Sequence, residues 1–407
     1  MKEYCIHIFF FISIATAFGQ EQLDSYINEA VTNNPGLKAK YAEFEIALQK
    51  VAQMSSLDDP RLSVSSFGQM VETRVGQQMA RFTLEQMFPW FGTLKAQKNA
   101  AALMAESDYE AWRSARIELI MNVKMAYYPI YEIDESIRLQ RENLEILSSL
   151  KTLATTRFQS GKGTLADALR VDLMTNEAET EIMLLAEMRK SQVVKFNRLL
   201  SRGDDSEVVV DRELQIEAQV PGTRDSIASH PKLIELQKQV QASQYQQKLA
   251  VKQGMPMLGL GADYIITQKR PGMTFEDNGK DAYMAMFTVS LPIYRKKYAA
   301  AIREAELMGS AYQSMYADME NEFSSEYEMA RYQWIKAKEE ASLFERQSRQ
   351  TQQIIDLLLT SYENSGADFE EILKMQQELV NYKIKTAGAI KENHIAKAKI
   401  DFLTSTH

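Results

Sequence analysis

Residues 82–92 read FTLEQMFPWFG, and residues 287–294 read FTVSLPIY. Each stretch alternates apolar and polar side chains and then reaches a proline beside aromatic or large apolar residues. The alternation predicts a β-strand, because successive side chains of a strand point to opposite faces. After each junction the chain runs on almost without glycine or proline, which favours a very long helix. A strand that gives way to a long helix is therefore encoded twice.

A set of prolines repeats in the two halves of the chain with the same spacing. Asn34-Pro35 corresponds to His230-Pro231, and Asp59-Pro60 corresponds to Met255-Pro256. The residue before a proline avoids the helical conformation, so the second proline of each half marks an exit from helix into extended structure. Repeats this long indicate duplicated structural repeats rather than the short units of a solenoid. We place the repeats at 20–200 and 225–407, joined by a linker or equatorial segment at 201–224.

Composition excludes several classes of protein. The formal net charge is −8 and no basic cluster with interleaved aromatic residues occurs, which argues against a nucleic-acid partner. The apolar run after Met1-Lys2 is typical of a secretory signal peptide, which we place at 1–19. The single cysteine, Cys5, lies inside it, so the mature chain suits an oxidising compartment. No later apolar run is long enough for a membrane-spanning helix.

Four segments have the alternation of strands. Each places apolar side chains on one face and polar or small ones on the other, at the length of a strand that crosses a bilayer in a barrel wall. The segments are about 61–70, 79–87, 257–266 and 283–291, and the polar loops between them are 71–78 and 267–282. Aromatic residues collect at the strand ends, as in interfacial belts. Alternation fits a soluble sandwich with one wet face as well as a membrane barrel, so both remain open on this evidence.

The rest of the sequence predicts helices, two of them too long for a globular core. The shorter helices cover about 23–56, 225–254, 165–200 and 368–404, and the long ones cover about 93–158 and 297–362. At the rise of an α-helix each long one measures roughly 100 Å. Such helices must lie against other helices as a coiled coil or a helical tube. We expect Pro129 to kink the first long helix locally, and we expect a short strand in the linker at Val208–Val210.

Each long helix ends at a turn that contains glycine. Gly161 and Gly366 supply the left-handed residue that caps a helix C-terminus. Thr164 and Asp368 can cap the helix that follows each turn. The turn residues that we single out are Gly161, Gly163, Thr164, Leu165, Gly366 and Phe369.

Residue types that carry catalysis are sparse and poorly spaced. The histidines after the signal segment, His230, His394 and His407, lack the spacing of metal ligands. The sequence has no His-Glu-x-x-His motif, no phosphate loop and no nucleophile elbow. Methionines cluster around the strands; thioethers can bind Cu(I), but methionine more simply fills irregular apolar surfaces. We therefore predict no catalytic residue, no metal site and no cofactor, and a protein that is not an enzyme.

Several of these features together resemble a known family. The duplicated order, the Asn-Pro and His-Pro starts, the glycine turns and the strand–helix junctions are similar to those of TolC-type outer membrane efflux proteins, over essentially the whole mature chain. The stretch 86–92 further resembles the heavy-metal branch of that family, the CusC- and CzcC-like proteins. The junction residues that carry the resemblance are Pro89, Trp90, Phe91, Gly92, Pro292 and Tyr294.

The resemblance implies a mainly α fold with a small β part, built as a homotrimer. Three chains would pool four strands each into a twelve-stranded transmembrane β-barrel, continuous with an α-helical barrel of long antiparallel helices. Closure by more than one chain is also expected physically, because four strands cannot seal a barrel and an open edge in lipid leaves backbone groups unpaired. The implied location is the outer membrane of a Gram-negative bacterium. The implied partners are outer membrane lipid, a periplasmic adaptor (membrane fusion) protein at the turns and an inner-membrane pump, favouring the RND type.

The resemblance also implies an acidic gate at the turns. The constriction residues of the family map onto Asp167 and Glu371, with Glu370 and Asp368 as adjacent candidates. Lys374 stands where relatives often have a second acid, which puts a doubled acidic ring in doubt. A ring of carboxylates would attract cations and can tighten a closed pore. Acids at a helix start can equally be ordinary caps, and both interpretations stay open.

These expectations describe a passive exit duct of a tripartite efflux system. The resemblance of 86–92 to the heavy-metal branch makes heavy-metal cations a candidate cargo, and the sequence itself leaves the cargo open. One alternative is a type I protein-secretion duct of the same fold. Others are a periplasmic adaptor or scaffold protein, which would carry a single helical hairpin, and a periplasmic enzyme on a helical scaffold.

Overall fold

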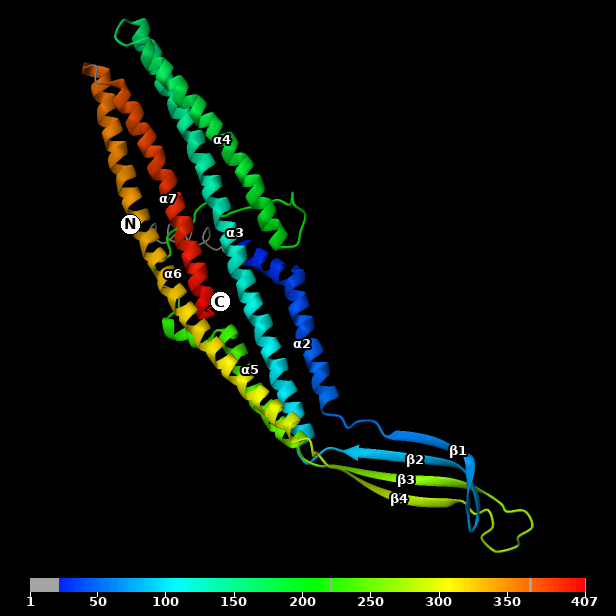
Figure 1. The fold of residues 1–407 in the computed structure, drawn as a ribbon. Helices are drawn as coiled ribbons and strands as arrows, with labels where there is room; N and C mark the ends of the chain where they lie inside the picture. The colour runs from blue at the N-terminus through cyan, green and yellow to red at the C-terminus, as the bar shows by residue number, and fades with distance from the viewer. Residues whose placement is uncertain (1–21, 220–221, 366–367, 407) are drawn as a thin grey trace, which may run out of the picture. The chain divides into compact units, whose positions relative to one another are not determined.

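The computed structural model describes residues 22–219, 222–365 and 368–406, so the expected signal peptide lies outside the described residues (Figure 1). The chain forms two compact units. The helical unit comprises Met1–Ala39, Trp112–Pro231 and Met319–His407, and the sheet unit comprises Lys40–Ala111 and Lys232–Asp318. Each unit therefore draws on both sequence repeats.

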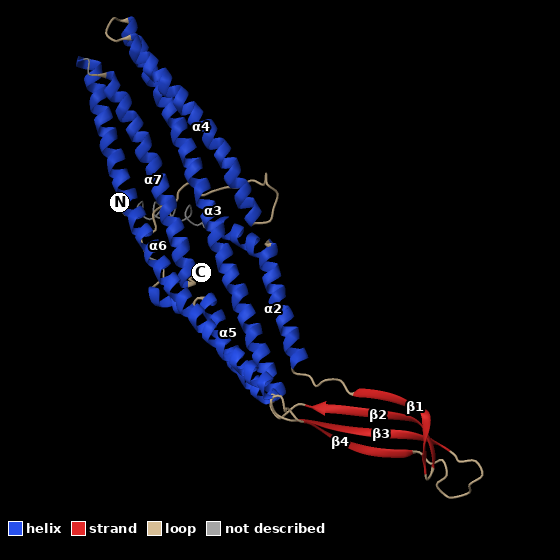
Figure 2. Ribbon diagram, viewed as in Figure 1, coloured by secondary structure: helices blue, strands red, loops and turns tan. Residues whose placement is uncertain are grey.

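The sheet unit contains the four strands in the order β1-β2-β3-β4, and all neighbours are antiparallel (Figure 2). The strands are β1 (Arg61–Thr73), β2 (Gly76–Phe88), β3 (Met257–Gln268) and β4 (Ala282–Ser290). The central pair, β2 and β3, joins the two repeats: Phe82 lies opposite Tyr264 and Leu84 opposite Ala262. The polar loop expected at 71–78 is wrong, because β1 and β2 continue to a tight turn at 74–75.

The sheet has two chemically different faces. Because residues paired across strands share a face, the register places the alternating apolar side chains of all four strands together. This face consists of Leu62, Val64, Phe82, Leu84, Leu260, Tyr264, Tyr283, Phe287 and Val289, all of them exposed. On the opposite face Arg81 pairs with buried Asp263, which also accepts a hydrogen bond from Thr83, so that β2 and β3 are fixed in register. An exposed apolar sheet face of this extent is unusual for a protein surrounded by water.

Helices enter and leave the sheet at one end of this unit. They are the later part of α2 (Pro35–Met54), the start of α3 (Thr93–Gln159), α5 (Pro231–Gln253) and the start of α6 (Arg295–Ser365). Lys252 donates to the carbonyl of Phe91 at 3.0 Å, and Arg295 donates to the carbonyl of Gly254 at 3.0 Å. The end of α5 is thereby tied to both strand–helix junctions.

The helical unit contains the longer parts of α3 and α6, with α4 (Leu165–Leu199) returning beside α3 and α7 (Phe369–Thr404) beside α6 (Figure 1). α3 continues through Pro129 as one helix. One core of this unit packs Tyr127, Ile130 and Phe196 with residues of the helix at 22–33 and of the linker. The expected fold class, mainly α with a small β part, is confirmed; the trimeric barrel remains a prediction.

Each repeat opens with a helix that breaks at the predicted proline. The first is helical over 22–33 and resumes with α2 after Asn34, whose side chain accepts a hydrogen bond from the amide of Leu37 at 3.0 Å. The second is the 3-10 helix η1 (Arg224–Ser229), which is followed by His230 in extended conformation and then by α5. The single helices expected at 23–56 and 225–254 are therefore wrong, because the residue before a proline avoids the helical region.

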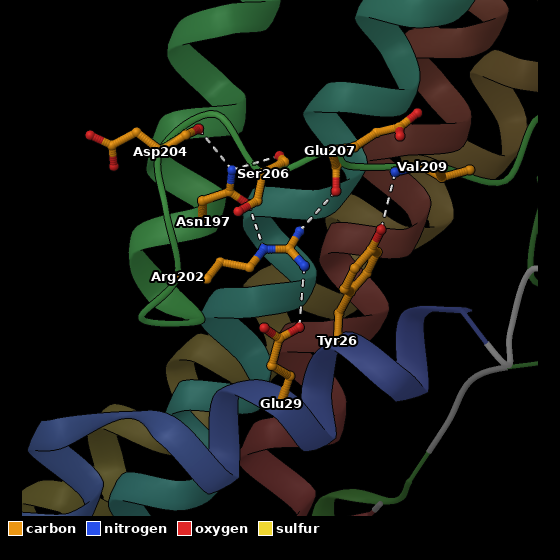
Figure 3. Close-up of polar contacts among 8 residues, drawn as sticks. All are labelled: Tyr26, Glu29, Asn197, Arg202, Asp204, Ser206, Glu207 and Val209. Carbon is orange, nitrogen blue, oxygen red and sulfur yellow. Dashed lines mark hydrogen bonds and ion pairs between the residues drawn. The ribbon is translucent and has the colours of Figure 1, made fainter.

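The linker forms no strand at Val208–Val210, so that expectation is wrong. Val208 and Val210 are instead buried in the core, and the amide of Val209 donates to the hydroxyl of Tyr26 at 3.1 Å. Arg202 anchors the linker, as Figure 3 shows: it donates to Asn197 at 2.7 Å, to Glu29 at 3.2 Å and to the carbonyl of Glu207 at 3.2 Å. Side chains thus replace the hydrogen bonds that a strand would have supplied.

We expect Arg202→Ala to destabilise the helical unit by about 2 kcal/mol, because it leaves the carboxylate of Glu29 and the amide oxygen of Asn197 without their charged donor. The measurement is chemical unfolding together with limited proteolysis of the linker. Arg212→Ala, at an exposed arginine of the same segment, is the matched control. Equal unfolding curves and equal cleavage for the two variants would contradict this account of the anchor.

Candidate functional site: the helical turns

The first turn, between α3 and α4, is closed by backbone bonds and a capping box. Gly161 adopts a φ of 73°, and its amide and that of Lys162 donate to the carbonyls of Phe158 and Arg157 at 3.0 and 2.9 Å. These bonds satisfy carbonyls at the end of α3. Thr164 and Asp167 then form a capping box at the start of α4. The Thr164 hydroxyl accepts a hydrogen bond from the Asp167 amide at 3.3 Å, and the Asp167 carboxylate accepts one from the Thr164 amide at 3.1 Å.

Gly163 in the same turn allows a close approach. A Cβ atom at this position would lie 3.1 Å from the Cβ atom of Arg157, which leaves little room for a side chain. Leu165, which follows Thr164 and was singled out from the sequence, is exposed. The first turn therefore presents a tight backbone with exposed apolar side chains, Phe158 and Leu165, on either side of it.

The second turn, between α6 and α7, starts its return helix differently. Asp368 accepts a hydrogen bond from the Glu370 amide at 2.9 Å and caps α7. Phe369 is buried, with its ring 5.1 Å from that of Tyr362. Gly366, the expected C-terminal cap of α6, lies outside the described residues.

The two turns pack together through a second hydrophobic core of the helical unit. The core combines Leu147, Leu150, Ala154, Ala168 and Val171 of the first repeat with Tyr362, Phe369, Ile372 and Leu373 of the second. Every one of these side chains is buried. The turns therefore behave as one packed element within a chain.

Arg157 and Tyr362 connect the turns directly, and no sequence pattern pairs them. The Arg157 guanidinium lies 4.2 Å from the centroid of the Tyr362 ring and donates to the Tyr362 carbonyl. Burial raises the pKa of the Tyr362 hydroxyl, and the neighbouring positive charge of Arg157 opposes that rise. A cation over an aromatic face contributes roughly 0.5–2 kcal/mol. The only available signal was that each residue directly precedes a glycine turn.

The candidate acids divide into caps and surface charges. Asp167 is nearly buried as a cap and lies 3.8 Å from Arg170, which in turn pairs with Glu370 at 2.8 Å. Arg170 therefore bridges the acids of the two turns. Glu371 is exposed, as is Lys374 one turn later. Within one chain the structure brings Asp167 and Glu370 to a shared cation and supports the capping role of Asp167 and Asp368.

Exposed leucines follow the first turn along α4. Leu165, Leu169 and Leu173 are spaced one helical turn apart, so they form a stripe on one face. Each is more than half exposed, at 52%, 55% and 64%. The charged side chains of Arg170 and Asp172 border the stripe, and exposed leucines beside such charges are typical of a surface that is covered by another protein.

The strand–helix junctions lie in the sheet unit. Gly92 adopts a φ of 77°, and a Cβ atom there would lie 3.1 Å from the Lys252 ammonium. Pro89, Trp90 and Pro292 are half-buried, whereas Phe91 and Tyr294 are exposed. The aromatic cluster therefore lies where the apolar sheet face ends.

In the described part of the chain, no group of three or more His, Cys, Asp or Glu side chains is placed to hold a metal ion. None of its helices has a stretch long and apolar enough to cross a lipid bilayer.

Part of the chain matches a known protein family: residues 26–202 match the family model described as outer membrane efflux protein. No curated protein sequence is similar enough to this chain to count as a match.

Solved structures share the fold over nearly the whole chain. The outer-membrane channel OprN is 16% identical with a TM-score of 0.78, covering 95% of this chain and 90% of its own. The outer membrane protein VceC from Vibrio cholerae is 15% identical with a TM-score of 0.77, and the match covers 94% of this chain and 96% of VceC. CusC, which is described as forming a transmembrane channel, is 15% identical with a TM-score of 0.78. The match covers 94% of this chain and 92% of CusC.

These comparisons agree with the resemblance seen in the sequence and with the expectation that the protein is not an enzyme, since the neighbours are channels. The family match over 26–202, together with a fold shared with outer-membrane channels through both repeats, makes this chain similar to the outer membrane efflux proteins.

Proposed function

We propose that the chain is one subunit of a homotrimeric exit duct that passively conducts substrates across the outer membrane of a Gram-negative bacterium. The observation that carries the proposal is the sheet. Its apolar face is exposed on all four strands, and among the described residues β1 and β4 have no partner on their outer edges. In lipid each unpaired backbone group costs several kcal/mol, so the edges must pair with those of further copies.

Three copies would supply twelve strands and close a barrel. The number three comes from the resemblance to TolC-type proteins, and the need for closure comes from the open edges of the sheet. The exposed apolar face would then point to lipid, and the face with Arg81 and Asp263 would line the channel. The long helices would form the periplasmic continuation of the duct.

We expect the chain to fractionate with the outer membrane as a trimer that resists SDS until it is heated. Leu62→Asp with Phe287→Asp places charges on the proposed lipid face and should lower recovery from the membrane strongly, each carboxylate costing less than the roughly 2–4 kcal/mol of a lysine or arginine at the bilayer centre. Ser63→Asp with Thr288→Asp, on the opposite face of the same strands, is the control and should leave recovery largely intact. A wild-type chain recovered as a soluble monomer would refute the proposal.

We further propose that the turns form the periplasmic gate of the duct. Support comes from the acids that converge there: Asp167 and Glu370 share Arg170, and Glu371 is exposed beside them. Three copies around an axis would repeat this cluster and produce a ring of carboxylates that attracts cations. Opening would require the packed turns to rearrange as helical bodies, in the manner of hinge and shear motions.

Asp167→Ala combined with Glu371→Ala should raise the single-channel conductance in planar bilayers and lower the preference for cations. The physical reason is that the variant removes a cap and one exposed carboxylate per chain from the constriction. Glu179→Ala with Glu345→Ala removes the same charge from exposed positions elsewhere on the helices and should change neither property. Conductance that stays at the wild-type value would remove the gate assignment.

We also propose that a periplasmic adaptor docks at the turns and that an inner-membrane pump, the RND type being favoured, supplies the energy. The stripe Leu165, Leu169 and Leu173 supports this, because exposed leucines at helical spacing suit a partner helix. The finer proposal of heavy-metal cargo rests on the similarity of 86–92 to the heavy-metal branch.

Leu169→Asp with Leu173→Asp should abolish rescue of a strain that lacks this gene, measured as growth on silver or copper salts, while the trimer still reaches the outer membrane. The reason is that charge on the stripe prevents burial against the adaptor. Leu184→Asp, at an exposed leucine further along α4, should rescue normally. Rescue by all variants would contradict the docking site, and a deletion strain that resists both metals normally would contradict the cargo.

A further inference from the structure

The strand–helix junctions carry a surface whose chemistry goes beyond that of a duct wall. We propose that this surface, the collar, binds the headgroups of anionic phospholipids in the leaflet that faces the helices. Its apolar part is Phe91, Leu291, Ile293 and Tyr294, and its basic part is Lys95, Lys98, Lys296 and Lys297. The inference rests on the proposed function, because it requires the sheet to lie in the membrane.

The apolar part continues the lipid-facing side of the sheet beyond its strands. Leu291 and Ile293 keep the alternation of Phe287 and Val289, although β4 itself ends at Ser290. Phe91, Ile293 and Tyr294 are 76%, 70% and 81% exposed. Large apolar and aromatic side chains at the edge of an apolar face are typical of the boundary between hydrocarbon and headgroups.

The basic part of the collar belongs to stretches of the sequence that contain basic residues but no acidic ones. The stretches 91–105, 236–262 and 282–303 contain lysine and arginine but no acidic residue, in a chain whose net charge is −8. They are the start of α3, the greater part of α5 with the start of β3, and β4 with the start of α6. The acids at this end of the sheet are Asp58 and Asp59, which lead into β1, and Glu85 of β2, which lies opposite Arg61.

The three basic segments meet in space. The Lys252 ammonium bonds to the Phe91 carbonyl and the Arg295 guanidinium to the Gly254 carbonyl, each at 3.0 Å, so these two cations hold the junctions together. The four collar lysines are exposed, and none of them forms an ion pair with a described residue. Lys297 lies 5.7 Å from the ring centroid of Tyr298 and keeps its charge at the surface.

The opposite end of the sheet lacks this excess of positive charge. There Arg270 pairs with Glu72 at 2.5 Å and Lys280 with Asp277 at 3.5 Å, so cations and acids are matched. The unpaired basic residues and the exposed aromatic residues occur together at one end of the sheet only. This asymmetry indicates contact with the headgroups of one leaflet and not of both. Lysine suits this position because its aliphatic stem lies along apolar surface while the ammonium reaches the phosphate layer.

The experiment uses the purified full-length trimer in dodecyl maltoside, titrated with phosphatidylglycerol or phosphatidylcholine and followed by native mass spectrometry. We expect tighter binding of phosphatidylglycerol. Replacing Lys95, Lys98, Lys296 and Lys297 by Gln should weaken phosphatidylglycerol binding by at least about tenfold and leave phosphatidylcholine binding unchanged, since one cation near an anionic surface contributes about fivefold. Raising the NaCl concentration to about 0.5 M should reduce the difference between the two lipids through screening.

The matched control replaces Lys190, Lys195, Lys336 and Lys374, four exposed helical lysines, by Gln and should bind both lipids like the wild type. Equal loss in test and control variants would overturn the inference, as would equal binding of the two lipids by the wild type. Full competition by millimolar inorganic phosphate would assign the collar to free anions and also overturn it. A chain that stays monomeric in every detergent would instead refute the proposed function.

Discussion

An open sheet with one apolar face is the constraint on which the rest of this protein depends. Four strands leave two edges of unpaired amides and carbonyls, and the exposed apolar side chains give the sheet no stable place in water. In the proposed assembly, strands from other copies would satisfy the edges and lipid would satisfy the face. The proposed oligomer therefore follows from backbone hydrogen bonding before any contact between subunits is considered.

Duplication solves a second problem, which is how one chain supplies matched strands and matched helices. The central pairing of β2 with β3 joins the repeats at the sheet, and the core around Tyr362 and Leu147 joins them at the turns. Each compact unit is therefore built from both repeats. Small motions of one turn cannot leave the other unaffected, because Arg157, Arg170 and the buried core connect them. If the turns form the proposed gate, it would move as a packed unit.

Local signals in the sequence were enough for most elements. Alternation located four strands, and the absence of glycine and proline located α3 and α6. Contacts between distant segments were not predictable in the same way. Arg157 meets Tyr362, and Arg202 meets Glu29, only because the helices bring them together. The valines at 208–210 have the propensity of a strand, but burial in the helical core and a hydrogen bond to Tyr26 determine their conformation instead.

The starts of the four longest helices carry opposite charges, and their environment explains the difference. α4 and α7 begin with acids, Asp167 in one and Glu370 and Glu371 in the other, as the helix dipole favours. α3 and α6 have no acid in their first turn and carry lysines there instead. Cations at a helix start are unfavourable by about 0.3–1 kcal/mol each in water. The proposed anionic headgroup layer beside the sheet would reverse that sign, because it would attract the lysines more strongly than the dipole repels them. Charge placement that looks unfavourable for an isolated helix is thus consistent with a helix that begins at a membrane surface.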